Sequence, residues 1–183
     1  MNNYLTLPIT MENNQSTILG DLCQGVTLCI FLRHWGCAEC SFLLHRLGPR
    51  LQELINLEVR IILIGLGSVE GIATFRDKHH LHRDDVLIVT DPTLSIHTQA
   101  GLERGNSAVK RPGAILNRVK LSLQGYTNQI GDGDLLQQGG AILLDQKQSE
   151  IWSHRNPYFG DVLDPNQLIN SALHASLNTS ALS

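Results

Sequence analysis

Two cysteines spaced three residues apart, Cys37 and Cys40, carry the strongest chemical signal in the sequence. An apolar run at residues 26–32 precedes them, Gly36 marks a turn, and a helical pattern opens at Ser41. This order predicts a strand that delivers a Cys-x-x-Cys pair to the N-terminus of a helix. Such an arrangement is typical of a thiol redox site.

The N-terminus of a helix favours a thiolate, because it carries about half a positive charge and amides without intrahelical partners. The pKa of the first cysteine is therefore expected to fall below the usual value of about 8.5. The second cysteine follows about one helical turn later. We expect Cys37 to be the attacking thiol and Cys40 to be the resolving thiol that attacks a mixed disulfide on Cys37.

Three other interpretations of the pair stay open. Both cysteines could be small buried residues that fill space under a loop. His34, Cys37 and Cys40 could be three metal ligands, completed by a residue from another loop or subunit. The chain could also be a non-catalytic binding protein that keeps the fold and docks a partner through residues 103–138.

Composition limits the classes of function. The chain has 183 residues, 42% of them hydrophobic, and a formal net charge of −3, which fits one globular domain with a substantial core. No basic run is present, so neither nucleic acid nor an anionic membrane is expected as a partner. Residues 1–10 lack the pattern of a secretory signal, and the longest uncharged apolar stretch, 61–69, is too short to cross a bilayer. We expect a cytoplasmic location.

The chain divides into three parts in this interpretation. Residues 1–16 are polar and asparagine-rich and are expected to form an irregular arm, and residues 177–183 a frayed tail. Between them, residues 17–176 form the domain. Its first segment, 17–22, is a short edge strand or turn, and pairing through that edge would give a homodimer.

Within the domain, strand and helix patterns alternate. The first helix is expected over residues 37–55, with an interruption at Gly48 and Pro49. An insertion at 103–138 with one helical patch breaks the alternation before a final hairpin and helix. Buried strands are expected at 26–32, 58–66 and 85–92, helices at 68–78 and 93–102, a hairpin at 139–154 and a last helix from Asp164. The pattern predicts an α/β fold with a central mixed sheet flanked by helices.

Several other features of the sequence have simpler explanations than a site. Gly65 and Gly67 lack the third glycine of a dinucleotide-binding fingerprint, because Glu70 stands at that position. The histidine-rich segment 79–82 fits an exposed turn better than a metal site. Cys29 is expected to be packed in its strand, and Cys23 to be an exposed thiol that nothing nearby activates.

The order of elements is that of the thioredoxin fold, and the motifs carry a family resemblance. Residues 31–40 read FLRHWGCAEC and resemble the F-x-R-x-x-G-C-x-x-C entry of the peroxiredoxin-like branch of the alkyl hydroperoxide reductase/thiol-specific antioxidant superfamily. The resemblance covers roughly residues 17–175. It continues in Asp91-Pro92, Gly101-Leu102-x-Arg104-Gly105, Gly133-Asp134-x-x-Gln137-x-Gly139-Gly140, His154-Arg155, Gly160-Asp161 and Asp164-Pro165.

The resemblance implies a thiol-dependent oxidoreductase that reduces a peroxide or a disulfide. The Cys37 thiolate would attack the substrate, giving a sulfenic acid or a mixed disulfide, and Cys40 would resolve it to a disulfide. A thioredoxin-like or glutathione-like thiol system would then reduce that disulfide, with no bound cofactor or metal. Some eukaryotic relatives in this family are linked to the reduction of prostaglandin endoperoxides.

The sequence departs from its relatives at three places. His34 and Ile30 stand where true peroxiredoxins have a Thr/Ser and a proline before the peroxidatic cysteine, and Gly139-Gly140 stands where thioredoxins have a cis-proline. The two glycines are expected to let a substrate or the Cys37 thiol approach the backbone.

Neighbouring basic residues bear on the same site. His34 or Arg33 could lower the pKa of the thiol through its charge. His154 and Arg155, at a strand end, could border the site.

Overall fold

The computed structural model describes residues 2–105, 112–128 and 133–180. The strands are β1 (Pro8–Met11), β2 (Ser16–Ile18), β3 (Thr27–Phe31), β4 (Arg60–Gly65), β5 (Val86–Thr90), β6 (Gly140–Leu144) and β7 (Glu150–Arg155). The helices are η1 (Asn3–Thr6), α1 (Leu19–Leu22), α2 (Ala38–Leu47), η2 (Gly48–Arg50), α3 (Leu51–Asn56), α4 (Glu70–Lys78), α5 (Ser95–Gln99), α7 (Pro112–Leu123) and α8 (Pro165–Ser180).

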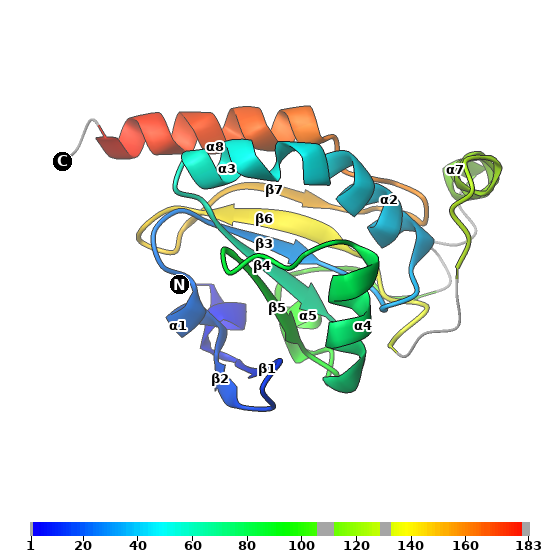
Figure 1. Cartoon of the computed structure of the whole chain (residues 1–183), viewed down its shortest axis with the longest axis horizontal. Coiled ribbons are helices and arrows are strands. Elements are labelled where there is room, and N and C mark those ends of the chain that lie inside the picture. Colours follow the sequence, from blue (N-terminus) through cyan, green and yellow to red (C-terminus); the bar gives the residue numbers. More distant parts are fainter. Residues whose placement is uncertain (1, 106–111, 129–132, 181–183) are drawn as a thin grey trace.

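All seven strands form one mixed sheet in the order β2-β1-β5-β4-β3-β6-β7 (Figure 1). Strands β3, β4 and β5 run parallel, and β6 and β7 add antiparallel on the far side of β3. Helices α2, α3, α4 and α8 pack on one face of the sheet, and η1, α1 and α5 pack on the other. The predicted α/β thioredoxin-like fold is confirmed.

Both faces of strand β3 are buried, as its continuous apolar sequence predicts. Successive side chains point to opposite faces. Leu28 and Ile30 enter the core under α2, whereas Cys29 and Phe31 enter the core on the other face. The end of β3 then leads through a short turn into α2, so the strand fixes where the Cys-x-x-Cys pair lies.

The predicted break in the first helix is also confirmed. Helix α2 ends at Leu47, Gly48 and Pro49 lie in the 3-10 turn η2, and α3 follows from Leu51. Proline lacks an amide hydrogen and therefore cannot continue the hydrogen-bonding pattern of α2.

The irregular N-terminal arm predicted for residues 1–16 is wrong. Strand β1 pairs antiparallel with β5 through Thr10 and Met11, and β2 extends the sheet beyond β1. Leu5 of η1 and Ile9 of β1 are buried. The edge of β5 offers free hydrogen-bonding groups, and apolar residues hidden among asparagines supply the burial that holds the segment there.

The C-terminal prediction needs a smaller correction. Helix α8 begins at Pro165 behind Asp164, whose Oδ1 accepts a hydrogen bond from the Asn166 amide at 3.1 Å, as expected of an N-cap. The helix runs on to Ser180, so the tail predicted to fray from residue 177 is helical as far as 180. Residues 181–183 lie outside the described part.

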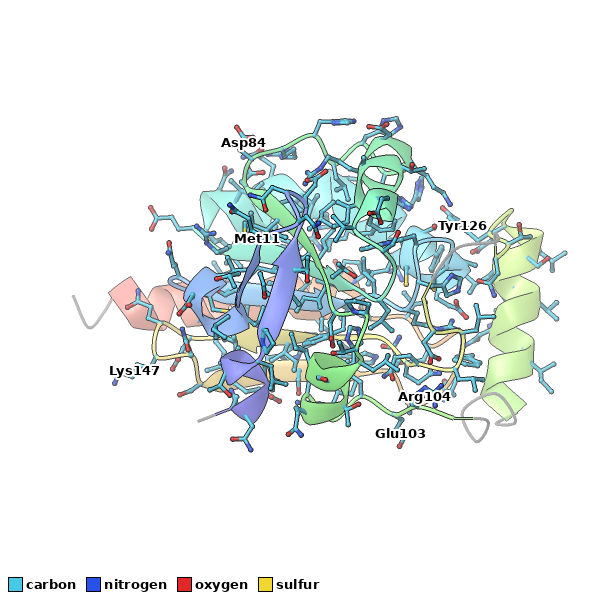
Figure 2. All side chains as sticks on the ribbon, turned by 90° about the horizontal axis from the view of Figure 1, so that it is seen from below. Met11, Asp84, Glu103, Arg104, Tyr126 and Lys147 are labelled. Carbon is cyan, nitrogen blue, oxygen red and sulfur yellow. The ribbon has the colours of Figure 1, made fainter. Side chains whose placement is uncertain are left out.

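The insertion at 103–138 contains α7, which stands at one end of the molecule with its side chains around it (Figure 2). It contacts the body mainly at α2. Within the described ranges, no helix is both long enough and apolar enough to cross a membrane.

Candidate active site around Cys37 and Cys40

Cys37 occupies the N-cap position of α2, immediately before Ala38. Its Sγ accepts a hydrogen bond from the Cys40 amide at 3.3 Å, as a capping side chain does. The turn before it is closed by the Cys37 amide, which donates to the His34 carbonyl at 3.0 Å. The structure therefore places the first cysteine where the sequence predicted it, at the positive end of a helix.

Arg33 connects both sulfurs. Its backbone amide donates to Cys40 Sγ at 3.4 Å, and its guanidinium Nη1 donates to Cys37 Sγ at 3.7 Å. The same guanidinium donates to two backbone carbonyls, that of Leu135 at 2.7 Å and that of Gln137 at 2.8 Å. These two residues belong to the segment that covers the thiols, which is called the cover below. Arg33 thus joins the two thiols to their cover.

Glu39 is the third charged group of the site. Its Oε2 lies 2.6 Å from Arg33 Nη1 in an ion pair that is almost fully buried. The same oxygen accepts a hydrogen bond from the Cys37 thiol at 3.2 Å. Nothing in the sequence marks Glu39 as part of the site, because a glutamate is usually exposed to solvent.

The two thiols are covered. Cys37 is 1% exposed and Cys40 is 6% exposed. The phenyl ring of Phe159 lies 4.1 Å from the Arg33 guanidinium carbon. A cavity of about 20 Å³ beside Cys40, Arg33 and Glu39 has room for about one water molecule.

Burial changes the electrostatics that the helix position alone predicts. Burial is the largest influence on the pKa of Cys37 and raises it well above its usual value, and the hydrogen bond with Cys40 raises it further. Arg33 opposes this rise. Burial also acts on Cys40, but hydrogen bonds from Cys37 and from the Arg33 amide leave the pKa of Cys40 below its usual value. The prediction of a lowered pKa at Cys37 is therefore wrong for this covered arrangement.

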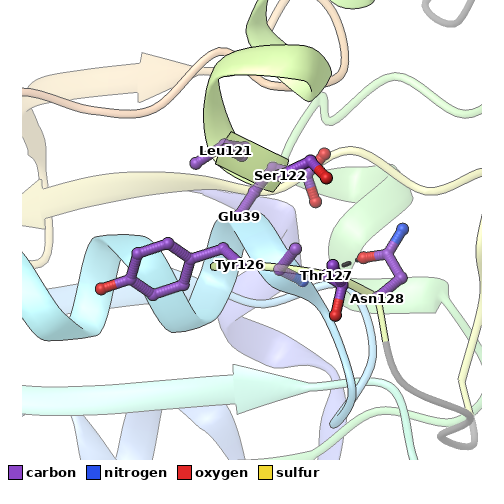
Figure 3. Close-up of a pocket in the computed structure, with 7 residues that line it drawn as sticks. Glu39, Leu121, Ser122, Tyr126, Thr127 and Asn128 are labelled. Carbon is purple, nitrogen blue, oxygen red and sulfur yellow. Dashed lines mark hydrogen bonds between the residues drawn. The ribbon is translucent and has the colours of Figure 1, made fainter. Parts of the chain in front are cut away.

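A second, larger cavity opens next to the start of α2 (Figure 3). It measures about 290 Å³. Leu121 and Ser122 of α7 form one side, the segment after α7 forms another, and Glu39 borders it. In that segment, Asn128 Oδ1 accepts a hydrogen bond from the Ala38 amide at 2.9 Å, so it caps α2 from outside the helix.

Asp91 and His97 support the backbone at the end of β3, which leads into the Cys-x-x-Cys turn. Asp91 Oδ2 accepts hydrogen bonds from the amides of Ile96 and His97, which fixes the start of α5. His97 Nε2 lies 3.0 Å from the Leu32 carbonyl, at the end of the strand that carries the active turn. Asp91 belongs to a motif noted in the sequence, but its partner His97 carried no signal there.

Trp35 explains Gly65, the first of the two glycines that resembled a nucleotide motif, and also Gly71 further along the chain. Its indole Nε1 donates to the Ser68 carbonyl at 3.0 Å, and its ring lies 4.9 Å from that of Phe75. A Cβ at Gly65 or at Gly71 would overlap the Trp35 ring. The glycines therefore make room for the indole beneath the Cys-x-x-Cys turn.

Gly139 and Gly140 pack against neighbouring backbone, and both also line the small cavity beside Cys40. A Cβ at Gly139 would lie 2.6 Å from the Phe31 carbonyl oxygen, and one at Gly140 would collide with the His154 carbonyl oxygen. Glycine is therefore needed at both positions for close backbone packing in the sheet, and the approach of a substrate to this backbone stays a prediction.

The remaining candidates, His34, His154 and Arg155, differ in how they relate to the two thiols. His34 is buried and forms a β-bridge with Gly133, which anchors the cover beside the active turn. His154 Nε2 lies 2.6 Å from Asp161 Oδ2, and Asp161 lines the small cavity by Cys40. Arg155 pairs with Glu150 on β7, away from the thiols.

The other two cysteines also form a pair. Cys23 is buried rather than exposed, and its thiol donates to the Leu19 carbonyl at 3.3 Å. A hydrogen bond with Cys29 lowers the pKa of Cys23, and Cys29, packed in β3 as predicted, has a raised pKa. The prediction that Cys23 is exposed and unactivated is wrong.

The metal interpretation receives no geometric support. Among the residues that the structure describes, no three histidine, cysteine, aspartate or glutamate side chains gather in a way that could hold a metal ion. This includes the set of His34, Cys37 and Cys40.

Comparison with known proteins agrees with the geometry. A family model described as "AhpC/TSA antioxidant enzyme" matches residues 44–157. The Xenopus laevis protein "Prostamide/prostaglandin F synthase" is 25% identical over 137 residues, which cover 72% of this chain and 65% of that protein. The chain thus spans about two thirds of the length of this curated relative.

Solved structures show the same fold at low identity. The bacterioferritin comigratory protein of Xanthomonas campestris matches with a TM-score of 0.61 and 12% identity, covering 96% of this chain and 93% of that one. Peroxidoxin BcpB of Mycobacterium tuberculosis matches at 0.63 and 12%, covering 92% of each chain. A secreted Mycobacterium tuberculosis disulfide oxidoreductase homologous to Escherichia coli DsbE matches at 0.59 and 11%, covering 95% and 99%.

Proposed function

Because the chain belongs to the AhpC/TSA antioxidant enzyme family, we propose that it is a thiol-dependent oxidoreductase that reduces a peroxide or a disulfide through Cys37 and Cys40. The observation that carries the proposal is the convergence of both sulfurs on Arg33. Cys37 Sγ accepts hydrogen bonds from the Arg33 guanidinium and from the Cys40 amide, and Cys40 Sγ accepts one from the Arg33 amide. These donors stabilise negative charge on sulfur.

The proposed peroxide reaction has three steps. The Cys37 thiolate attacks the peroxide oxygen, the O–O bond breaks, and the products are a Cys37 sulfenic acid and an alcohol or water. The Cys40 thiol then displaces water from the sulfenic acid to form the Cys37–Cys40 disulfide. An external dithiol reduces this disulfide and becomes oxidised itself. With a disulfide substrate, the first product is a mixed disulfide instead.

The reaction requires the cover to open. Cys37 is 1% exposed, and Arg33 holds the covering segment through Leu135 and Gln137. We propose that this segment moves away from Arg33 when the substrate enters, and that the cavity between α7 and the start of α2 is the route in.

The partners follow from the chemistry. We propose that the reductant is a thioredoxin-like or glutathione-like thiol system. The proposed location is the cytoplasm, where such systems keep thiols reduced. We further propose that residues 17–176, with β1 added to their sheet, act as one thioredoxin-like domain. A homodimer through the edge strand β2 is a further proposal that gel filtration with light scattering tests.

The proposal is tested by mass spectrometry after reaction with a stoichiometric amount of hydrogen peroxide. The peptide that contains Cys37 and Cys40 should lose two hydrogens, and the loss should require both thiols. Cys40→Ser should accumulate a Cys37 sulfenic acid that dimedone traps, and Cys37→Ser should trap none. The proposal fails if peroxide leaves both residues unmodified, or if modification occurs at Cys23 and Cys29 instead.

A second candidate, a thioredoxin-fold binding module, is favoured by one observation. Several large apolar side chains of α7 and of the cover are exposed. They are Ile115, Leu116, Val119, Leu123 and Leu135. Exposed apolar groups of this kind often mark docking surfaces. A Cys37→Ser/Cys40→Ser variant that keeps full biological activity would favour this candidate over the enzyme.

A further inference from the structure

The Glu39 carboxylate contacts both the Cys37 thiol and the Arg33 guanidinium. Its Oε2 accepts one hydrogen bond from the Cys37 thiol at 3.2 Å and another from Arg33 Nη1 at 2.6 Å. Arg33 Nη1 also reaches Cys37 Sγ at 3.7 Å. The thiol, the carboxylate and the guanidinium therefore form a closed triangle in which each group contacts the other two.

We propose that Glu39 is the proton carrier of this site: it accepts the proton of the Cys37 thiol and later returns it to the leaving group of the substrate. The inference rests on the proposed function of Cys37. Because Glu39 touches the reacting sulfur, it is assigned a catalytic role and not only a positioning role.

The physical reason for this role is that the number of buried charges stays the same during the proton transfer. Before the transfer, the buried site holds the Arg33 cation and the Glu39 anion. After the transfer, it holds the Arg33 cation and the Cys37 thiolate, with Glu39 neutral. The proton moves between two anions of one cation, so no new charge is created in a low-dielectric environment, where an isolated charge is costly. A buried thiol can thus become nucleophilic without losing its proton to water.

The same proton balances the substrate reaction. When the Cys37 thiolate attacks a peroxide, the O–O bond breaks and its outer oxygen leaves with an electron pair. Neutral Glu39 donates its proton to that oxygen, so an alcohol or water departs and the carboxylate is restored beside Arg33. With a disulfide substrate, the proton goes to the departing thiolate in the same way.

Other titratable groups of the described residues also lie near the triangle. Cys40 on α2 contacts Cys37, and Asp161, paired with His154, lines the small cavity on the side of β6 and β7. Asp161 is already engaged by His154 at 2.6 Å. Glu39 is the carboxylate that accepts a hydrogen bond from the Cys37 thiol.

The test compares two reactions that differ in their need for a proton. Iodoacetamide alkylates a thiolate and releases iodide, which needs no proton, whereas hydrogen peroxide releases an oxygen that must be protonated. Glu39→Gln keeps the size of the side chain but cannot carry the proton. It also removes the carboxylate that competes with the thiolate for the Arg33 cation, so alkylation of Cys37 should be unchanged or faster. The ratio of the peroxide rate to the alkylation rate should fall at least about ten-fold, since general acid catalysis contributes about 10²- to 10⁴-fold.

Competing roles give different ratios. If Glu39 is only structural, both rates fall together, and if its charge only opposes the thiolate, both rates rise together. An unchanged ratio therefore overturns the inference. Glu70→Gln on α4 is the matched control, because Glu70 also lies in the first turn of a helix but is exposed, and it should alter neither rate.

The pH profile of alkylation supplies an independent readout. In the unmodified chain the pair shares one proton over a range of pH, so the alkylation rate of Cys37 should be level there, whereas in Glu39→Gln it should follow a single titration. If Glu39→Gln does not fold, Glu39→Asp keeps a carboxylate and should keep the level range. Absence of that range in the unmodified chain overturns the inference. A level range without peroxide reduction would instead contradict the proposed function and leave the proton carrier standing.

Discussion

The Arg33 guanidinium lies 3.7 Å from Cys37 Sγ and 2.6 Å from Glu39 Oε2, so one buried cation faces two acidic groups. Replacing it by glutamine removes the cation that stabilises a thiolate. Arg33→Gln should slow iodoacetamide alkylation of Cys37 at pH 7 at least about ten-fold, since one pKa unit corresponds to about 1.36 kcal/mol. Peptide-resolved alkylation rates measure this.

The same variant leaves the Glu39 carboxylate buried without its partner, which costs about 3–5 kcal/mol in comparable pairs. Stability should therefore be measured by urea unfolding alongside. Arg46→Gln is the control, because Arg46 pairs with Asp164 at the surface. Equal alkylation rates in the Arg33 and Arg46 variants would show that Arg33 does not act on the thiol.

Asn128 caps α2 with an uncharged oxygen, and an aspartate there would cap equally well while adding a negative charge. Asn128→Asp should keep stability close to that of the unmodified chain but slow alkylation of Cys37 about two- to five-fold, which corresponds to about 0.3–1 kcal/mol at a helix terminus. The effect should shrink in high salt. Asn128→Ser, which adds no charge, serves as the control, and an equal slowing in both variants contradicts the electrostatic explanation.

His79 makes the fold sensitive to mild acid. Burial lowers the pKa of His79 to about 4, assisted by Lys78 and His80. Below its unfolded pKa of about 6.5 the unfolded chain binds a proton that the folded chain does not bind, so stability should fall as the pH drops from about 6.5 to about 4. Allowing for partial exposure, the loss should be about 2 kcal/mol.

Urea unfolding at several pH values measures the slope. His79→Gln removes the titrating group and should flatten the profile over this interval, whereas His82→Gln at an exposed position should not. An unchanged slope in His79→Gln would assign the acid sensitivity to other groups.

The Trp35 ring fills the space beside Gly65, where a Cβ would overlap it. Gly65→Ala should lower the free energy of unfolding by about 1–3 kcal/mol, as overpacking of a core does. Adding Trp35→Leu to this variant should recover part of the loss, and a double-mutant cycle measures the coupling. Strictly additive effects would mean that the two residues do not compete for the space.

Much of the scaffold was predictable because it depends on local patterns. The apolar run before Cys37, the break at Gly48-Pro49 and the alternation of strand and helix each have a periodicity or a breaker that acts within a few residues. The N-terminal strands were missed for the opposite reason. β1 is held by the edge of β5, far along the chain, and four polar asparagines conceal its apolar residues.

The site was predictable in its cysteines but not in its surroundings. Cys37 at a helix start follows from sequence, whereas the burial that raises its pKa comes from the cover. The cover is fixed by backbone carbonyls of Leu135 and Gln137, and a backbone carbonyl leaves no signature in a sequence. The function of Glu39 also requires the fold, since only the turn of β3 into α2 brings Arg33 back onto it.

Strand β3 directs its neighbouring cysteine pairs to opposite sides of the sheet, with Cys37 and Cys40 in one core and Cys23 and Cys29 in the other. A bulk thiol titration of this protein therefore adds two populations that do not share an environment. An inhibitor or label reaches the two pairs from opposite faces of the sheet. Reagents of different size and polarity should consequently separate the two populations, and an oxidation state is meaningful here only when assigned face by face.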